Sequence, residues 1–285
     1  MRSLSQHSYQ PTVQQVDSYE NRQRLIQAYL EYKSKNDPIF FAERVGFKPD
    51  DWQKDVLTWV QRNKQKKIPP GLLLNCSRQT GKSTTAAYLA THTAIYYKNS
   101  LILLVSPSLR QSSEIFRKVR DTLHSLKLEV ELDEDNRLSC QLRNKSRIVS
   151  LPGIEKTVRG YSGATLIIED ESARVDDEMY HSIRPMLAVS KGLLILMSTP
   201  FGKRGHFHQA WESKDEEWDR IEVPATSCPR IDPAWLEKEK KGMGEWWFLQ
   251  EYMCKFMDAM DSVFNHDTIM AAISSEVKPL FEVAV

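Results

Sequence analysis

The sequence has few cysteines and no long apolar run. Its four cysteines, Cys76, Cys140, Cys228 and Cys254, are widely scattered and form no CxxC or CxxH pair. That spacing argues against a structural zinc site and a disulfide framework, and it fits a reducing cytosol. The polar N-terminus lacks the apolar core of a signal peptide. The longest apolar runs, LILLV and GLLILM, have strand length and are too short to cross a bilayer. We therefore expect no membrane partner.

The sequence also lacks an excess of charge of either sign. Its 285 residues include 39 lysines and arginines against 38 aspartates and glutamates. Any contact with nucleic acid must therefore come from a local basic patch rather than from global charge. Hydrophobic residues make up 41% of the chain and charged residues 27%, which is ordinary for a soluble globular protein. The length allows one large domain or two modest ones.

From Gly71 onward, short apolar runs alternate with segments of helical spacing. The strand-like runs are GLLLNCS, LILLVSP, ATLIIEDE, GLLILMSTP and WDRIEVPA, with a hairpin-like stretch before the third. The helical segments are 82–97, 109–126, a helix near 176–188, 205–212, and two helices within 233–254. This alternation predicts parallel βαβ units with right-handed crossovers. We expect the most apolar runs to be central strands, buried on both faces.

Helices are also expected before Gly71. Residues 17–34 and 38–47 have helical spacing, and the segment after KPDD is amphipathic, with a start capped by Asp50 or Asp51. The first fifteen or so residues are polar, and we expect them to be disordered.

The stretch CSRQTGKST at 76–84 has the context of a phosphate-binding loop. A GKS turn alone could simply cap a helix, but here an apolar strand precedes it and a helix follows. In such a loop backbone N–H groups face the phosphates, a lysine adds charge and a hydroxyl reaches magnesium. We assign the last two roles to Lys82 and Ser83. The expected nucleotide-binding residues are Ser77, Arg78, Gln79, Thr80, Gly81, Lys82, Ser83 and Thr84. Cys76 stands where such loops usually have glycine, so an ordinary φ is expected there.

Two further strand ends complete the candidate site. A carboxylate for Mg²⁺ and another to orient the attacking water are needed on a neighbouring strand, and we assign them to Asp170 and Glu171. Glu169 occupies a place where an apolar residue is usual, and it either pairs with a base or faces solvent. In the alternative assignment, the pair of catalytic carboxylates is shifted by one residue to Glu169 and Asp170. Ser198, Thr199 and Pro200 end the third strand. By itself this is a plain turn, but small hydroxyl residues beside a γ-phosphate suit sensing whether that phosphate is present.

The order of these motifs resembles the large terminase subunit of tailed bacteriophages, the ATPase of the DNA-packaging motor. The resemblance covers roughly residues 38–265. It is carried by DWQ at 51–53, CSRQTGKS at 76–83, VRGYSGATLIIEDESARV at 158–175 and LMSTPFGKRGHF at 196–207. It implies ATP and Mg²⁺ as cofactors. It also implies an α/β P-loop (ASCE-type) ATPase fold, with a mainly parallel central sheet flanked by helices, an added strand between the two Walker strands, and small helical segments at both ends.

The resemblance implies roles for individual residues. Gln53 matches the adenine-recognition position, where a glutamine amide can pair with N6 and N7. Arg78 would reach the γ-phosphate in cis. Arg159 matches the arginine proposed to act in trans on a neighbouring subunit's ATP; the alternative is a loop arginine that binds a carboxylate. Ser198, Thr199 and Pro200 would form the coupling motif that links hydrolysis to domain movement.

The resemblance also implies a division of the chain and a set of partners. The expected segments are a disordered N-terminus at 1–16, a helical subdomain with the adenine-recognition segment at 17–68, the ATPase core at 69–255, and a linker at 256–285 towards an absent nuclease domain. We therefore expect ATP hydrolysis without DNA cleavage. The expected partners are double-stranded DNA, the portal protein of the procapsid, the small terminase subunit, and further copies in a ring on the portal, with a monomer when free. The expected place is the host bacterial cytoplasm, at the portal during packaging and not in the mature virion.

The residues that face DNA are left open. Candidates are Arg143, Lys145, Arg147, Lys203 and Arg204, with a further run of Arg62, Lys64, Lys66 and Lys67. Each is at least equally well explained by a solvated charged face.

Two other functions are alternatives. A two-lobed helicase or translocase would need a second RecA-like lobe, and the residues after STP are too few for one. A nucleotide-dependent switch or DNA adaptor would have less use for Glu171.

Overall fold

The structure is a computed structural model that describes residues 13–126, 132–153, 160–258 and 272. Its centre is an eight-stranded sheet with the order β3-β4-β5-β2-β6-β7-β1-β8. The pairs β3–β4 and β4–β5 are antiparallel and the others are parallel. The strands are β1 (Gly71–Cys76), β2 (Leu101–Ser106), β3 (Leu132–Asp135), β4 (Ser139–Leu142), β5 (Arg147–Pro152), β6 (Leu166–Asp170), β7 (Leu193–Ser198) and β8 (Trp218–Val223). Strand β7 separates β1 from β6, as expected for the added strand.

The central strands are buried on both faces of the sheet. Every residue of β1, β6 and β7 is buried. Successive side chains of a strand point to opposite faces, so Leu72 and Leu74 join one core cluster while Leu73 joins the other. The continuous apolar runs therefore supply two cores, one on each side of the sheet.

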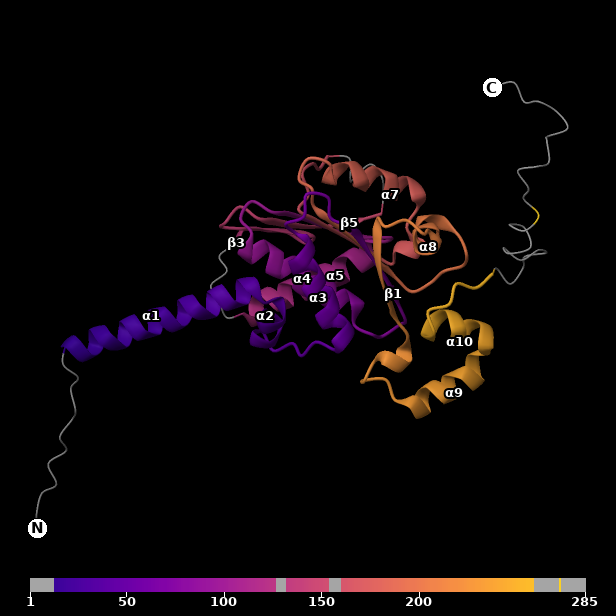
Figure 1. Ribbon diagram of the computed structural model, residues 1–285, viewed down its shortest axis with the longest axis horizontal. Helices are drawn as coiled ribbons and strands as arrows, with labels where there is room; N and C mark the ends of the chain where they lie inside the picture. Colours follow the sequence, from indigo (N-terminus) through magenta and orange to yellow (C-terminus); the bar gives the residue numbers. More distant parts are fainter. Residues whose placement is uncertain (1–12, 127–131, 154–159, 259–271, 273–285) are drawn as a thin grey trace, which may run out of the picture.

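Helices cover both faces of this sheet (Figure 1). One face packs against α3 (Asp51–Asn63), α4 (Lys82–Tyr96) and α5 (Leu109–Ser125), and the other against α7 (Asp177–Ile183) and α8 (Gly205–Glu212). The remaining helices are α1 (Val13–Asn36), α2 (Pro38–Arg44), α9 (Pro233–Met243), α10 (Glu245–Tyr252) and the 3₁₀ turns η1 (Ser172–Arg174), η2 (Arg184–Leu187) and η3 (Ala225–Ser227). Helices α9 and α10 share a small core of their own, formed by Ala225, Leu236, Phe248 and Tyr252. Helix α1 projects from the body.

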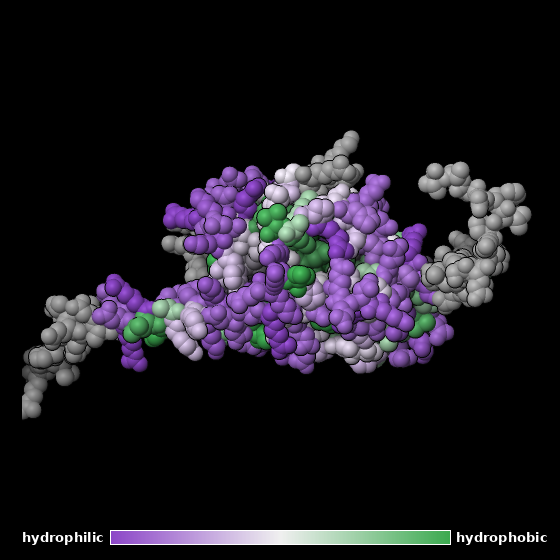
Figure 2. All heavy atoms as spheres, turned by 45° about the horizontal axis from the view of Figure 1, so that its top comes forward, coloured by the Kyte–Doolittle hydropathy of each residue, from purple (hydrophilic) through white to green (hydrophobic). Residues whose placement is uncertain are grey.

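The N-terminal helix starts earlier than the sequence pattern predicts. It begins at Val13, inside the segment expected to be disordered, and shortly after Pro11, which a helix interior would not accommodate. Residues 1–12 lie outside the described residues, as does nearly all of the expected linker at 256–285. No helix among the described residues combines the length and apolarity needed to cross a membrane. Figure 2 shows one face on which hydrophilic side chains predominate and hydrophobic ones form small patches.

Candidate functional site

The phosphate-loop residues lie at the carboxyl edge of the central strands. The loop leaves β1 after Cys76 and leads into α4, whose first residue is Lys82. A pocket of about 490 Å³ opens there, lined by Arg78, Gln79, Gly81, Lys82, Ser83, Thr84, Gln111, Lys118, Glu171 and Arg174. Ligand sites of open parallel sheets form at this edge, outside the carboxyl ends of the strands. The topology thus brings together residues that lie up to about a hundred positions apart in the sequence.

The backbone of the loop bends at Gln79 and Gly81 rather than at its opening residue. These two residues have φ values of 63° and 96°, whereas Cys76 ends strand β1 without a positive φ, as expected. The buried hydroxyl of Thr80 donates to the carbonyl of Ser77 at 3.0 Å and closes the loop on itself. A Cβ on Gly81 would come within 3.1 Å of Nε2 of Gln53, so a larger residue would crowd the neighbouring helix.

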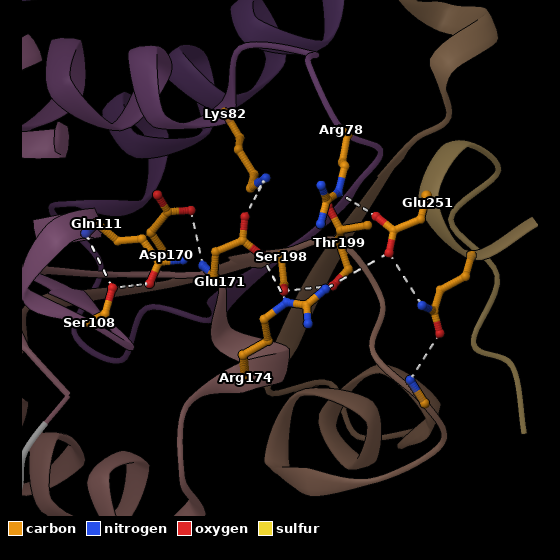
Figure 3. A network of polar contacts seen from close by, with 12 residues as sticks. Arg78, Lys82, Ser108, Gln111, Asp170, Glu171, Arg174, Ser198, Thr199 and Glu251 are labelled. Carbon is orange, nitrogen blue, oxygen red and sulfur yellow. Dashed lines mark hydrogen bonds and ion pairs between the residues drawn. The ribbon is translucent and has the colours of Figure 1, made fainter. Parts of the chain in front are cut away.

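Lys82 and Glu171 form an ion pair inside the pocket (Figure 3). Nζ of Lys82 lies 2.8 Å from Oε1 of Glu171, and both side chains are largely buried. Burial alone would lower the pKa of Lys82, but Glu171 and Asp170 raise it, so the ammonium stays charged. The lysine therefore presents a positive charge at the start of α4, where the amide groups of the helix also face outward.

Ser83 and Asp170 make an oxygen-rich position suited to a small divalent ion. The Ser83 hydroxyl donates to Oδ2 of Asp170 at 2.9 Å, while Oδ1 accepts from the backbone N–H of Glu171 at 3.0 Å. Burial raises the pKa of Asp170; Lys82 opposes this and Glu171 adds to it. A cation would relieve that cost by favouring the carboxylate. Mg²⁺ prefers one or two carboxylate or hydroxyl oxygens together with waters and phosphates, so these two residues fit it.

Glu171 differs from the expectation of two acids on an extended strand end. Strand β6 ends at Asp170, and Glu171 takes a left-handed backbone with φ 54° and ψ 40° at the start of η1. This turn, rather than the alternation of a strand, separates the two carboxylates. Oε2 of Glu171 also lies 3.8 Å from Nε of Arg174.

Arg78 lines the pocket, and its side chain pairs with a residue of helix α10. Its Nε lies 2.5 Å from Oε2 of Glu251, and its backbone N–H donates to the Glu251 carbonyl at 3.1 Å. The same carboxylate lies 3.9 Å from Arg174, whose guanidinium covers the ring of Phe201 at 4.0 Å from the centroid. Figure 3 shows that both arginines contact the Glu251 carboxylate. Sequence reasoning missed Glu251 and Arg174; no local motif marks a glutamate on a distant helix.

Gln53 is hydrogen-bonded within the chain, and its expected pairing with adenine stays a prediction. Its Oε1 accepts the Asp50 N–H at 2.8 Å and its Nε2 donates to Thr85 Oγ1 at 3.0 Å. It is the third residue of a helix capped by Asp50, the position from which a glutamine reaches back to the cap. Both atoms therefore already have one partner in the chain, and each can still form a second hydrogen bond.

Arg230 and Lys118 also reach the loop region and were not singled out from the sequence. Arg230 donates to the Thr80 carbonyl at 2.7 Å and pairs with Asp50 at 2.6 Å. Lys118 extends from α5 into the pocket and donates to Thr84 Oγ1 at 3.3 Å. Burial lowers the pKa of Lys118, although Asp170 counteracts part of this shift.

The expected coupling residues lie between the phosphate loop and the acidic pair. Ser198 ends β7, beside Asn75 of β1, and its hydroxyl donates to the Thr199 carbonyl at 2.7 Å. The Thr199 hydroxyl is buried and finds no hydrogen-bond partner among the described residues. Pro200 follows as a buried residue.

Glu169 turns away from this pocket. It is fully buried, and its Oε2 lies 3.1 Å from Nε2 of His206, so it pairs with a base rather than facing solvent. The structure brings Asp170, and not Glu169, to Ser83. Arg159 lies outside the described residues, so its trans role stays a prediction.

Comparisons with known proteins place this arrangement in a family. The family model described as "Terminase large subunit, T4likevirus-type, N-terminal" matches residues 73–270. The large terminase subunits of Thermus phage G20c and Thermus virus P23-45 are each 25% identical over 270 residues, which cover 79% of this chain and 52% of theirs. The chain thus spans about half the length of these curated relatives.

Solved structures give the same fold. The large terminase ATPase domain of Thermus phage P74-26, in a mutant form, superposes with a TM-score of 0.65 at 18% identity, covering 76% of this chain and 98% of that one. The HK97 bacteriophage large terminase gives a TM-score of 0.61 at 18% identity, covering 74% and 51%. The expected α/β P-loop fold of the ASCE type, with its mainly parallel sheet, is confirmed. Because the family model matches more than half of this chain, the chain belongs to the terminase large subunit family and corresponds to the N-terminal part that the model describes.

Proposed function

We propose that this protein is the ATPase motor of viral DNA packaging, which hydrolyses ATP to move double-stranded DNA into a procapsid. The observation that carries the proposal is the convergence of Lys82, Ser83, Asp170 and Glu171 at one sheet edge, in a chain of the terminase family. Among structures of similar fold, the large terminase of a thermophilic bacteriophage is in complex with ADP in one case and with ATP-γ-S in another, which supports ATP as the ligand here.

The loop and α4 would bind the phosphates of ATP. The backbone N–H groups of Ser77, Arg78 and Thr84 donate to carbonyls of the chain. Those from Gln79 to Ser83 and the positive end of α4 would face the anion, and Lys82 adds a full charge. When phosphate arrives, it competes with Glu171 for the Lys82 ammonium. The exchange would leave the Glu171 carboxylate available to a water molecule beside the γ-phosphate.

Ser83 and Asp170 would hold Mg²⁺. The ion neutralises phosphate charge when bound, and the short contact between the two oxygens supports these residues as its protein ligands. Burial makes Asp170 suited to this role, because its carboxylate is not solvated by water and a bound cation would stabilise its negative charge.

Hydrolysis would then proceed by in-line attack of water on the γ-phosphorus. Glu171 orients the water and accepts a proton as the new P–O bond forms and the bond to the β-γ bridging oxygen breaks, which leaves ADP and phosphate. Arg78 would neutralise charge on the γ-phosphoryl group in cis, after parting from Glu251. Arg159 of a neighbouring subunit would do so in trans.

The remaining parts of the proposal concern coupling and partners. Ser198, Thr199 and Pro200 lie between the loop and the acids, which supports a role in linking phosphate release to movement. Family membership supports the ring on the portal protein, the small terminase subunit as a partner, the monomeric free state and the location in the host cytoplasm, all of which remain proposals. Among the candidate DNA contacts, Lys145 pairs with Asp133 at 2.8 Å and Lys64 covers the Tyr97 ring at 4.2 Å, which fits a charged face.

The test compares Glu171→Ala with the exposed control Glu237→Ala in the full chain. We expect Glu171→Ala to bind ATP with nearly unchanged affinity and to lose hydrolysis by at least about a hundredfold, while the control behaves as wild type. Turnover is measured with and without duplex DNA. A wild-type chain that binds ATP but hydrolyses none under either condition would favour a nucleotide-dependent switch. Strand separation without a capsid partner would favour a helicase-like translocase.

A further inference from the structure

A buried acid–base cluster connects β6 with α7 and α8, outside the phosphate pocket. Glu169 is fully buried, and its Oε2 accepts the Ser172 hydroxyl at 2.9 Å and faces Nε2 of His206 at 3.1 Å. Nε2 also lies 3.0 Å from the Ser172 oxygen. The Ser172 hydroxyl and the His206 ring therefore meet around one carboxylate oxygen.

The other edge of the His206 ring is equally engaged. Its Nδ1 lies 3.1 Å from Oδ1 of Asp177, the same oxygen that accepts the His206 backbone N–H at 2.8 Å. The ring stacks on Tyr180 at 4.3 Å and 9°. Because both ring nitrogens face carboxylate oxygens, an imidazolium satisfies both contacts. The histidine thus joins β6, α7 and α8 at a single point.

Stability alone does not explain this cluster. Oε1 of Glu169 is buried and has no hydrogen-bond partner among the described residues. A buried ion pair is often no more stabilising than apolar residues of similar volume, and an apolar residue is what this strand position usually holds. The location of the cluster indicates a role in the site instead, because Glu169 directly precedes Asp170 and Glu171.

The cluster includes residues on both sides of Glu171 in the sequence. Glu169 lies two residues before it and Ser172 one residue after it, and both bond to the same His206 nitrogen. Between these anchors Glu171 takes its left-handed backbone, a conformation that is uncommon for a residue other than glycine. That conformation directs the carboxylate to Lys82. His206 itself stands at the start of α8, just after the segment that contains Ser198, Thr199 and Pro200.

We propose that His206 is a positioning residue: with Glu169 and Ser172 it fixes the turn that aims Glu171 into the nucleotide pocket, and it ties that turn to the helix that follows the coupling segment. This inference rests on the proposed ATPase function. It requires that loss of the cluster misplaces Glu171 while the phosphate loop, which the cluster does not touch, stays intact.

The test uses His206→Gln, Glu169→Gln and the milder Ser172→Ala in the full chain, with the exposed His124→Gln on α5 as matched control. Thermal unfolding establishes folding, titration with a fluorescent ATP analogue gives affinity, and steady-state turnover gives kcat. We expect His206→Gln and Glu169→Gln to lower kcat between about tenfold and about a hundredfold, because small misplacements of a reacting group have effects of this size. Affinity should change by less than about threefold, and the control should not differ from wild type.

Two further measurements separate positioning from packing. The double variant Glu169→Gln/His206→Gln should be no slower than the slower single variant, because both changes break one unit. The apolar pair Glu169→Leu/His206→Phe fills the space and keeps the stack on Tyr180, yet it should stay slow. If this pair turns over at the wild-type rate, or if folded Ser172→Ala, His206→Gln and Glu169→Gln all do, the inference is wrong. Losses of affinity that parallel the losses of kcat would also overturn it. A wild-type chain that binds but does not hydrolyse ATP would instead mark failure of the proposed function.

Discussion

Nε of Arg78 lies 2.5 Å from Oε2 of Glu251, so the phosphate loop is tied to helix α10, which lies far along the sequence. In the proposed function a phosphate binds the same guanidinium. Phosphate and Glu251 would then compete for one cation, and the position of α10 would depend on whether the loop holds a nucleotide.

Glu251→Gln should tighten ATP binding. The change keeps the shape of the side chain but removes the charge that competes for Arg78. Because the arginine is more than half exposed, we expect a gain of only about two- to fivefold, in line with the roughly 0–1 kcal/mol of exposed ion pairs. Isothermal titration with an ATP analogue gives the affinity, with exposed Glu245→Gln on the same helix as control. An unchanged or weaker affinity would show that Glu251 does not compete with the nucleotide.

Gln53→Ala should lower stability rather than the preference for adenine. The variant loses the bond to the Asp50 N–H and the bond to Thr85, a loss of about 1 kcal/mol by analogy with helix caps. The ratio of ATP to GTP affinity should stay within about twofold. Denaturant unfolding and competition binding measure the two effects. A lost preference for ATP with unchanged stability would instead assign Gln53 to adenine recognition.

Acidification should loosen the packing of α1 and α2 on α4 through His92. Burial is the main reason that the pKa of this histidine is lowered from 6.5 to about 4, and its Nε2 contacts the Ser34 carbonyl at 3.0 Å. The unfolded chain therefore binds a proton at a higher pH than the folded chain does. The stabilisation from neutral His92 is complete above pH 6.5 and is lost as the pH falls towards 4. His92→Phe should flatten this slope in denaturant unfolding; a wild-type slope in that variant would assign the acid sensitivity to other groups.

Alkaline conditions should weaken the cluster around His206. Burial alone would lower the pKa of His206, but the facing carboxylates Glu169 on β6 and Asp177 on α7 raise it above 6.5. Tyr180 stacks on the same ring, and burial raises the pKa of its own hydroxyl. A raised folded-state pKa contributes stability that is complete below 6.5 and lost as the pH rises through the folded-state value. The free energy of unfolding should therefore decrease as the pH rises above neutral. His206→Gln should remove this part of the dependence of stability on pH.

Cys76→Gly, which restores the usual first residue of a phosphate loop, should not improve nucleotide binding. Cys76 lies buried within β1 at an ordinary φ, and burial raises the pKa of its thiol to about 12. Glycine there adds no needed freedom and leaves a small cavity, at a cost of roughly 1–2 kcal/mol. Thermal unfolding and ATP titration measure the two effects. A tighter affinity in the glycine variant would show that cysteine constrains the loop after all.

The sequence by itself determined the elements and the chemistry that depends on neighbouring residues. Short apolar runs marked the strands, and GKS between a strand and a helix marked Lys82 and Ser83, because these signals are local. The order of strands and helices indicated a parallel sheet. In such a sheet the carboxyl ends share one edge, which is why Asp170 could be placed near Ser83 in advance.

The tertiary structure decided what depends on partners far along the chain. The pairing of Arg78 with Glu251, of Glu169 with His206, and of Arg230 with Asp50 joins residues whose spacing carries no periodic signal. Gln53 has the sequence context of a base-binding residue, and only the structure shows that its amide also bonds to the Asp50 N–H and to Thr85. The turn at Glu171 likewise depends on anchors from α8. Local propensity selects each element, whereas the direction of a polar side chain depends on which partner packing brings within hydrogen-bonding reach.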